Sequence, residues 1–293
     1  MRAIALTAAR LARLDFLELT KPRLSSFVLL VVALAAWLGA GGAIEPGTLL
    51  LAVVGTGLVA GGANALNMVI ERDLDARMAR TRARPIPSGR LEPHEAAIFG
   101  GTLTVAGLLL LLGTTPLASL LAALTSASYL LVYTPLKRVT TLNTHVGAVP
   151  GALPALIGWA AARGQLDPAA WTLFAIVYLW QVPHFLSIAW LYRDDYARGG
   201  YRMLPSADPA GRLTGRQAVL GAAALVPASL LPSLAGITGA AYFLGALVVG
   251  LWFVRRSIAF AMERTPATAR GLLRASLVYL PAVLLLMFLD RLP

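Results

Sequence analysis

The chain has 293 residues, of which 58% are hydrophobic and only 13% are charged, and its formal net charge is +11. This composition excludes an ordinary soluble globular protein, in which about a quarter of the residues are charged. The chain has no cysteine, which excludes a disulfide framework, a thiolate nucleophile and a cysteine-based zinc site.

The apolar residues form long blocks that almost lack charge. A helix needs about 20 apolar residues to cross the roughly 30 Å of hydrocarbon in a bilayer. No linker rich in proline, serine or charge divides the chain, so we expect a single all-α integral membrane domain over residues 1–293. The basic N-terminal stretch precedes a block that is too long for a signal peptide, and we expect that block to be the first span. The predicted spans are residues 25–43, 48–70, 96–113, 117–136, 146–162, 169–191, 217–236, 238–254 and 272–289.

The basic residues lie almost entirely on one side of the predicted membrane. With nine spans, 23 of the 25 lysines and arginines fall on the side of the N-terminus, and only Arg163 and Arg291 fall opposite. We expect a protein of the bacterial inner membrane, and the positive-inside rule predicts that its N-terminus is cytoplasmic and its C-terminus external. This distribution argues against a nucleic-acid partner and favours contact with anionic lipid. Eight spans would also fit if the seventh and eighth were misassigned. That would change which basic residues lie on each side of the membrane.

A first polar motif lies at the cytoplasmic end of the second span. Asn67, Glu71 and Asp75 are four residues apart, so they share one face if the helix continues past the apolar run. Oxygen ligands on one face suit a hard cation such as Mg²⁺, and diphosphate oxygens could complete its coordination. An ordinary solvated loop is the alternative, although an amide inside an apolar span is costly unless it is used. The arginines that would face the same phosphates are Arg72, Arg80 and Arg84.

A second polar segment ends the sixth span. Gln181, His184 and Ser187 are three residues apart within the predicted bilayer and should face the protein interior. Asp194 and Asp195 follow at the same cytoplasmic surface as the first motif, so the two acidic helix ends could together hold two metal ions. His184 has three alternatives: a hydrogen-bonded packing role, a role in proton transfer, and a contact with a ligand.

Two further basic motifs lie on the same side. Lys137 and Arg138 follow the fourth span and could bind a phosphate, and anchoring at the membrane surface explains them equally well. Lys21 and Arg23 enter the first span, where anchoring is again the alternative. Prolines in the segment 150–154 should break or kink the fifth span and could make room for a large ligand.

Taken together, the motifs resemble those of the UbiA-type intramembrane prenyltransferases, in the form typical of protohaem IX farnesyltransferases. Each motif alone is weak, but the ordered set is specific and covers roughly residues 20–205. The motifs that carry the resemblance are Asn67-x-x-x-Glu71-Arg72-Asp73-x-Asp75-x-x-Met78-x-Arg80-Thr81-x-x-Arg84-Pro85, Thr20-Lys21-Pro22-Arg23, Tyr133-Thr134-Pro135-Leu136-Lys137-Arg138, Gly147-Ala148-Val149-Pro150-Gly151-Ala152 and Trp180-Gln181-x-Pro183-His184-Phe185.

The resemblance implies a fold of about nine helices around a central cavity that opens to lipid. It implies transfer of the farnesyl group of farnesyl diphosphate to a vinyl group of haem B, with addition of water, giving haem O and diphosphate. Haem A synthase and terminal-oxidase assembly proteins are the partners that it suggests.

The resemblance matches Asn67, Glu71 and Asp75 to the Mg²⁺-diphosphate positions of the first motif, and Lys137 and Arg138 to a basic pair that faces the diphosphate. Together with the polar residues described above, these matches give the expected site. The expected catalytic residues are Asn67, Glu71, Asp75 and His184; the expected Mg²⁺ ligands are Asn67, Glu71, Asp75, Asp194 and Asp195; and the expected diphosphate ligands are Lys21, Arg23, Arg72, Arg80, Arg84, Lys137 and Arg138. Related enzymes usually have three acids in the second motif, whereas this chain has only the adjacent pair. Binding of a second Mg²⁺ is therefore in doubt.

Two other functions are compatible with part of the sequence. A prenyltransferase could use an aromatic acceptor, as in quinone synthesis, but the second motif and the segment Pro183-His184-Phe185 argue against it. A transporter of an anionic metabolite could use the same acids and arginines as a gate. Transporters often contain inverted repeats, and the two halves of this chain show no convincing similarity.

Overall fold

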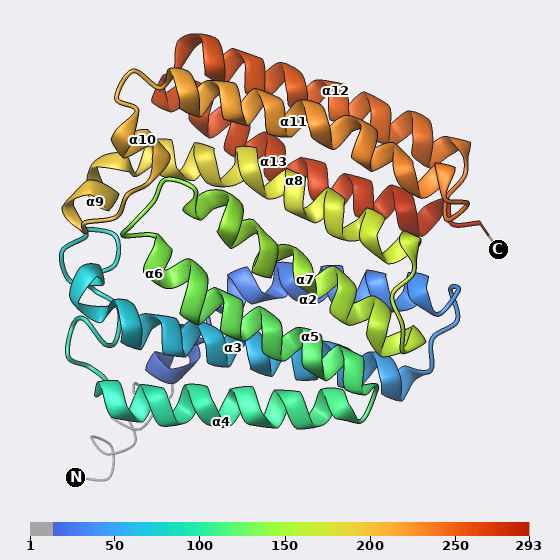
Figure 1. The fold of residues 1–293 in the computed structure, drawn as a ribbon, viewed down its shortest axis with the longest axis horizontal. Coiled ribbons are helices and arrows are strands. Elements are labelled where there is room, and N and C mark those ends of the chain that lie inside the picture. The colour runs from blue at the N-terminus through green and yellow to red at the C-terminus, as the bar shows by residue number, and fades with distance from the viewer. Residues whose placement is uncertain (1–13, 293) are drawn as a thin grey trace.

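The computed structural model describes residues 14–292, and this part of the chain is almost entirely helical (Figure 1). Nine helical segments in it are long and apolar enough to cross a membrane, in agreement with the predicted number, and the seventh and eighth are separate. They are α2 (Pro22–Gly39), α3 (Pro46–Asp75), α4 (Pro93–Leu112), the composite of α5 (Pro116–Ala127), η1 (Ser128–Tyr133) and α6 (Thr134–Leu136), α7 (Asn143–Arg163), α8 (Pro168–Leu191), α11 (Arg212–Leu234), α12 (Ala240–Glu263) and α13 (Pro266–Leu289).

Prolines and capping side chains set where many of these helices begin. Proline occupies the first turn of six of the spans, where the missing N–H would have no helical partner. Before α3, the Glu45 carboxylate accepts hydrogen bonds from the N–H groups of Gly47 and Thr48 at 2.8 and 2.6 Å. We expected a break or a kink in the fifth span; α7 continues through Pro150 and Pro154, so the break is not found and the kink remains a prediction.

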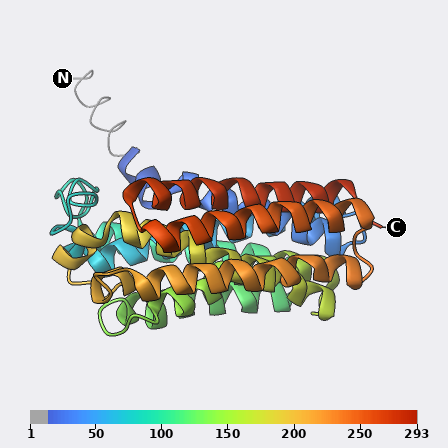
Figure 2. The same cartoon turned by 90° about the horizontal axis from the view of Figure 1, so that it is seen from above.

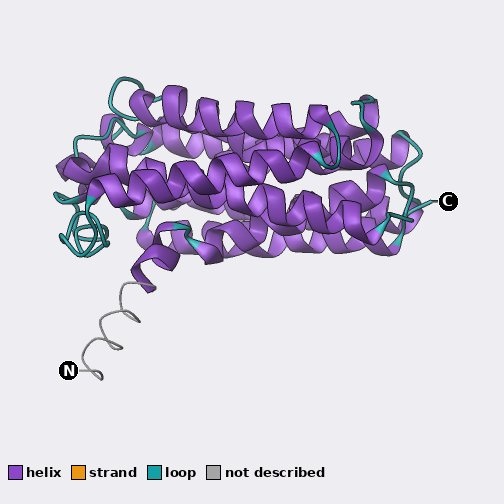
Figure 3. Cartoon of the chain, turned by 90° about the horizontal axis from the view of Figure 1, so that it is seen from below, coloured by secondary structure: helices purple, strands orange, loops and turns teal. Residues whose placement is uncertain are grey.

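The long helices run lengthwise beside one another, and the connections gather at the two ends of the bundle (Figures 2 and 3). The most extensive helix pairs are α3 with α4, α11 with α12, and α2 with α7. One end carries the short helices α9 (Arg193–Arg198) and α10 (Leu204–Ala207) and the connection between α3 and α4. Helix α2 begins at one end of the bundle and α13 ends at the other, as an odd number of spans requires (Figure 1).

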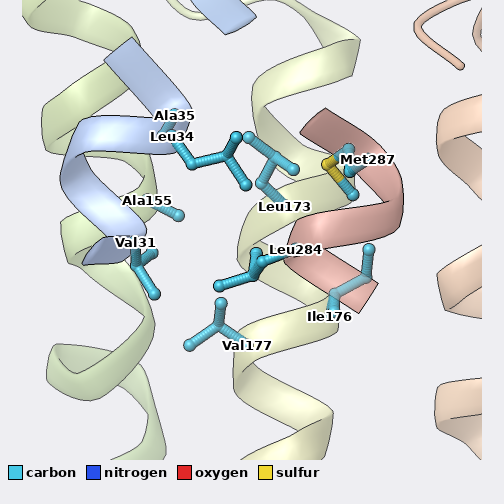
Figure 4. Close-up of a pocket in the computed structure, with 9 residues that line it drawn as sticks. All are labelled: Val31, Leu34, Ala35, Ala155, Leu173, Ile176, Val177, Leu284 and Met287. Atoms are coloured by element: carbon cyan, nitrogen blue, oxygen red, sulfur yellow. The ribbon is translucent and has the colours of Figure 1, made fainter. Parts of the chain in front are cut away.

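The middle of the bundle is closely packed. Apolar side chains from α2, α7, α8 and α13 converge there, among them Val31, Leu173 and Met287 (Figure 4). The gap between them has room of about 10 Å³, which is about the size of one water molecule. This gap is too small for a farnesyl chain, and the large cavity that the resemblance implies remains a prediction.

Candidate active site

Three polar side chains form a buried row at the end of α3. The helix does not end where the apolar run ends, at Ile70, but continues to Asp75. Asn67, Glu71 and Asp75 are therefore about one turn apart on one face, and these residues are 2%, 5% and 2% exposed. We call this row the acid stripe. Two buried carboxylates require compensating charge, and neighbouring segments supply it.

Two cations from different segments neutralise the acid stripe. Lys137, directly after α6, places its Nζ 2.8 Å from Oε1 of Glu71. Arg84, in the loop that follows α3, donates from Nη1 to Oδ2 of Asp75 over 2.6 Å. Both pairs are largely withdrawn from water, so each cation offsets a charge that would otherwise be costly to bury.

The π-helical turn η1 of the fourth span lies next to the residue that bonds to the acid stripe. Single π-helical turns of this kind occur often at functional sites. Thr134, the first residue after η1, donates to the Tyr129 carbonyl oxygen at 2.8 Å and accepts from Nδ2 of Asn67 at 3.0 Å. Because the Asn67 nitrogen is used in this way, its amide oxygen is the atom left for a cation.

Tyrosine rings surround the lysine of the site, a feature to which the sequence analysis gave no role. Nζ of Lys137 lies 4.6 Å from the ring centre of Tyr133 and 5.8 Å from that of Tyr201. Burial raises the pKa of Tyr201, and the carboxylates of Glu71 and Asp75 raise it further. This phenol therefore stays neutral. The motif containing Tyr133 was recognised, but a tyrosine near a membrane surface is more often an interfacial anchor.

An open pocket lies beside the acid stripe. It has room of about 440 Å³, and its charged walls include Lys21, Arg23 and Arg84, together with the apolar side chain of Met68. Since Arg84 both lines this pocket and binds Asp75, the pocket adjoins the stripe. Three predicted diphosphate ligands thus meet at one opening.

Lys21 has an unusual backbone and an altered acidity. Its φ of 49° places it in the left-handed region, which residues other than glycine rarely adopt and which is often found at functional sites. Burial, followed by the charges of Arg84 and Lys137, lowers the pKa of Lys21 to about 7. An anion that enters the pocket would favour the charged form of this amine.

Three other predicted cations form no ion pair with the acid stripe. Arg72 forms a 3.6 Å ion pair with Asp73 and is exposed. Arg138 is exposed as well. The Arg80 guanidinium lies 5.4 Å from the ring centre of Tyr192, over α9 rather than over the stripe. In their present arrangement these three arginines do not contact Glu71 or Asp75.

The two acids of the second motif differ sharply from each other. The Asp194 side chain is 83% exposed and lies 3.8 Å from Arg193. Asp195 is buried, and both of its carboxylate oxygens accept hydrogen bonds. Desolvation alone would raise the pKa of Asp195, but hydrogen bonds from Arg198 and from two backbone N–H groups outweigh it and leave the pKa below its ordinary value.

His184 lies within α8 and makes packing contacts. Its Nδ1 is 2.8 Å from Oγ of Ser276 on α13, and its ring stacks on Trp180 with the centroids 4.8 Å apart. Gln181 donates to the carbonyl oxygens of Ala148 and Val177. These hydrogen bonds use Nδ1 of His184 and the amide nitrogen of Gln181, and a catalytic role of His184 remains a prediction.

The side-chain oxygens of the acid stripe are suitable ligands for Mg²⁺, because carboxylate and amide oxygens are hard ligands. Within residues 14–292, no three Asp, Glu or His side chains lie close enough to hold a metal ion by themselves. Mg²⁺ typically binds through one or two carboxylates and takes its other ligands from water and substrate phosphates. The stripe is therefore suited to a cation that arrives with a diphosphate.

Several proteins of similar sequence have been named for one activity. A protein of Solibacter usitatus (strain Ellin6076) named protoheme IX farnesyltransferase is 48% identical over 287 residues, covering 94% of this chain and 98% of that protein. A protein of the same name from Salinibacter ruber (strain DSM 13855 / M31) is 48% identical over 280 residues, covering 94% and 98%.

Solved structures share the fold at low sequence identity. A digeranylgeranylglyceryl phosphate synthase superposes with a TM-score of 0.80 and 19% identity, covering 95% of this chain and 98% of that one. A UbiA homolog from Archaeoglobus fulgidus bound to GPP and Mg²⁺ gives a TM-score of 0.61 and 12% identity, covering 93% and 99%. The model of the UbiA prenyltransferase family matches residues 28–280, and the chain belongs to this family.

Proposed function

We propose that this protein transfers the farnesyl group of farnesyl diphosphate to a vinyl group of haem B, with addition of water, to give haem O and diphosphate. The observation that carries the proposal is the buried, ion-paired acid stripe in a chain 48% identical to proteins named protoheme IX farnesyltransferase. Glu71 and Asp75 supply the negative charge that a Mg²⁺ ion needs when it binds together with diphosphate.

The leaving group is stabilised by cations that already lie at the site. Lys137 and Arg84 exchange their carboxylate partners for diphosphate oxygens, and Lys21 and Arg23 hold the diphosphate from the pocket side. Mg²⁺, held by Asn67, Glu71 and Asp75, would neutralise charge on the diphosphate. The solved homolog with GPP and Mg²⁺ supports a metal in this fold.

The transfer itself needs an apolar environment. The allylic C–O bond breaks, its electron pair leaves with diphosphate, and the vinyl group supplies the electrons of the new C–C bond. Water then adds at the remaining cationic carbon and loses a proton to solvent. The residues next to the stripe, including the buried Met68, limit access of water to the allylic cation before the vinyl group attacks.

We also propose that the acid stripe faces the cytoplasm of a bacterial cell. The support is the one-sided distribution of lysine and arginine, which places the loop after α3 on the basic side. On this side the protein has access to cytosolic Mg²⁺ and to farnesyl diphosphate.

The proposal is tested with purified protein in lipid nanodiscs supplied with farnesyl diphosphate, Mg²⁺ and one acceptor at a time. With haem B, mass spectrometry should detect haem O in the wild type and none in Asp75→Asn. With 4-hydroxybenzoate, no prenylated product should form. Prenylation of the aromatic acid but not of haem would contradict the proposal and favour an aromatic acceptor.

A further inference from the structure

The Asp195 carboxylate joins α9 to the loop that follows α3. Its Oδ1 accepts from the N–H of Ala79 at 2.8 Å and from Nη2 of Arg198 at 2.7 Å. Its Oδ2 accepts from the N–H of Arg80 at 3.2 Å. Residues 79 and 195 are far apart in the sequence, so these bonds fix a long-range contact.

Side-chain packing extends the same contact. Met78 is 2% exposed and packs in a small cluster that includes Tyr201 and Met203. The Arg80 guanidinium lies over the ring of Tyr196, 5.6 Å from its centre. Thr81, which is fully buried, donates to the main-chain oxygen of Asp75 at 2.8 Å. The first turn of the loop is thus held between α9 and the end of the acid stripe.

These contacts leave Asp195 poorly suited to bind a metal. A carboxylate has about four acceptor positions, and three of them are used by the donors from Ala79, Arg80 and Arg198. Within the described part of the chain, Asp195 also does not combine with Glu71 and Asp75 into a group able to hold an ion. One acceptor position remains, on Oδ2, so a metal bound to both oxygens would have to displace hydrogen bonds that shape the loop.

We propose that Asp195 is a positioning residue rather than a ligand of Mg²⁺. Its hydrogen bonds attach residues 76–84 to α9, and this contact, which we call the latch, sets the position of Arg84 beside the acid stripe. The inference rests on the proposed function for its link to diphosphate. It assigns the two aspartates of the second motif different roles, because Asp194 points into solvent and makes none of these bonds.

The latch can be tested without any activity measurement, because the chain contains no cysteine. Thr81→Cys introduces a single thiol that should be protected from a maleimide reagent in the full-length protein. Adding Asp195→Asn should raise its labelling rate at least tenfold, and the milder Arg198→Gln should raise it less. Asp194→Asn is the matched control and should leave the labelling rate unchanged. Equal labelling in the Asp195 and Asp194 variants would overturn the proposal.

The link to the site is tested by binding of inorganic pyrophosphate in the presence of Mg²⁺. Asp195→Asn should weaken pyrophosphate binding about tenfold, whereas the Mg²⁺ concentration for half-maximal binding should stay the same. A tenfold rise in that concentration would make Asp195 a metal ligand and overturn the proposal, as would faster labelling with unchanged pyrophosphate affinity. If the wild type binds pyrophosphate and shows the latch but does not farnesylate haem, only the proposed function fails.

Discussion

At the scale of single residues, the site depends on carboxylates that are buried together with their counter-ions. The Glu71 and Lys137 side chains are 7% and 13% exposed, and those of Asp75 and Arg84 are 2% and 20% exposed. Removing one member of a buried pair leaves an uncompensated charge, which costs more than the pair contributes. In the proposed function, Mg²⁺ and diphosphate take the place of the partners in these two ion pairs.

Lys137 neutralises Glu71 and is expected to bind diphosphate, and replacing it tests these two roles separately. Lys137→Gln should lower the free energy of unfolding by about 3 to 5 kcal/mol, because Glu71 stays buried without its partner. Thermal unfolding in detergent measures this loss. The double variant Glu71→Gln with Lys137→Gln should recover most of the stability but no haem farnesylation. A double variant no more stable than Lys137→Gln would show that the ion pair does not account for the effect.

The lowered pKa of Lys21, at about 7, predicts proton uptake on binding. At pH 8 most of this amine is neutral in the free protein, and a bound diphosphate raises its pKa and thus protonates it. Diphosphate affinity should therefore fall as the pH rises above about 7. Calorimetry of pyrophosphate binding in buffers of different ionisation enthalpy measures the uptake.

Lys21→Arg is the control for this measurement, because its guanidinium is charged in both states. Subtracting the proton uptake of Lys21→Arg from that of the wild type removes the contribution of protons that pyrophosphate itself exchanges. Equal uptake by wild type and Lys21→Arg would contradict the assignment.

At the scale of elements, hydropathy predicted the spans but not how far a helix extends beyond the membrane. The predicted second span ended at Ile70, whereas α3 continues to Asp75. The extension is stable because Lys137 and Arg84 neutralise its acids, and these partners come from other parts of the chain. The shared face of Asn67, Glu71 and Asp75 could be predicted from the sequence, because a spacing of four residues keeps side chains on one side of a helix.

Long-range contacts could not be predicted from the sequence. Adjacent aspartates at 194 and 195 are equivalent in the sequence, and only the fold buries one and exposes the other. Tyr201 lies in a short polar stretch without a helical pattern, yet it reaches Lys137 and the acid stripe. Such roles depend on which loop packs on which helix end, and local periodicity carries no information about that.

Close approach of α3 and α4 depends on glycines that face each other. A Cβ added at Gly107 would lie 2.5 Å from the Gly55 carbonyl oxygen and 2.8 Å from the backbone N of Val59. Gly107→Ala should therefore push the helices apart and destabilise the protein by about 1 to 3 kcal/mol. A Cβ at Gly101 on the same helix meets nothing within 4 Å, so Gly101→Ala should leave the unfolding temperature unchanged. Equal unfolding temperatures for the two variants would contradict this view of the interface.

At the scale of the whole molecule, the charge distribution has two functions. We propose that most of the basic residues orient the protein in the membrane and that a few of them, Lys21, Arg84 and Lys137 above all, form the site at the same end. Orientation and catalysis thus make use of the same electrostatic asymmetry. The number of charges in the sequence could not separate the orienting residues from the site residues, because the two groups differ in how deeply their side chains are buried.

The orientation is tested with two single cysteines in the otherwise cysteine-free chain. Ser88 lies in the loop between α3 and α4, and Gln165 lies in the loop between α7 and α8, and both are exposed. In intact spheroplasts, a membrane-impermeant maleimide should label Gln165→Cys at once and Ser88→Cys only after lysis. The reverse pattern would place the acid stripe outside the cell.

Haem extraction from living cells tests most directly whether the ion-paired acid stripe catalyses the farnesylation of haem. The wild type and the Glu71→Gln and Asp75→Asn variants are expressed in a bacterial host that lacks its own haem O synthase, with membrane insertion checked for each. The haems are then separated and identified by mass. Haem O should accumulate with the wild type and be absent with both variants. Absence of haem O with inserted wild type, or undiminished haem O with either variant, would contradict the account.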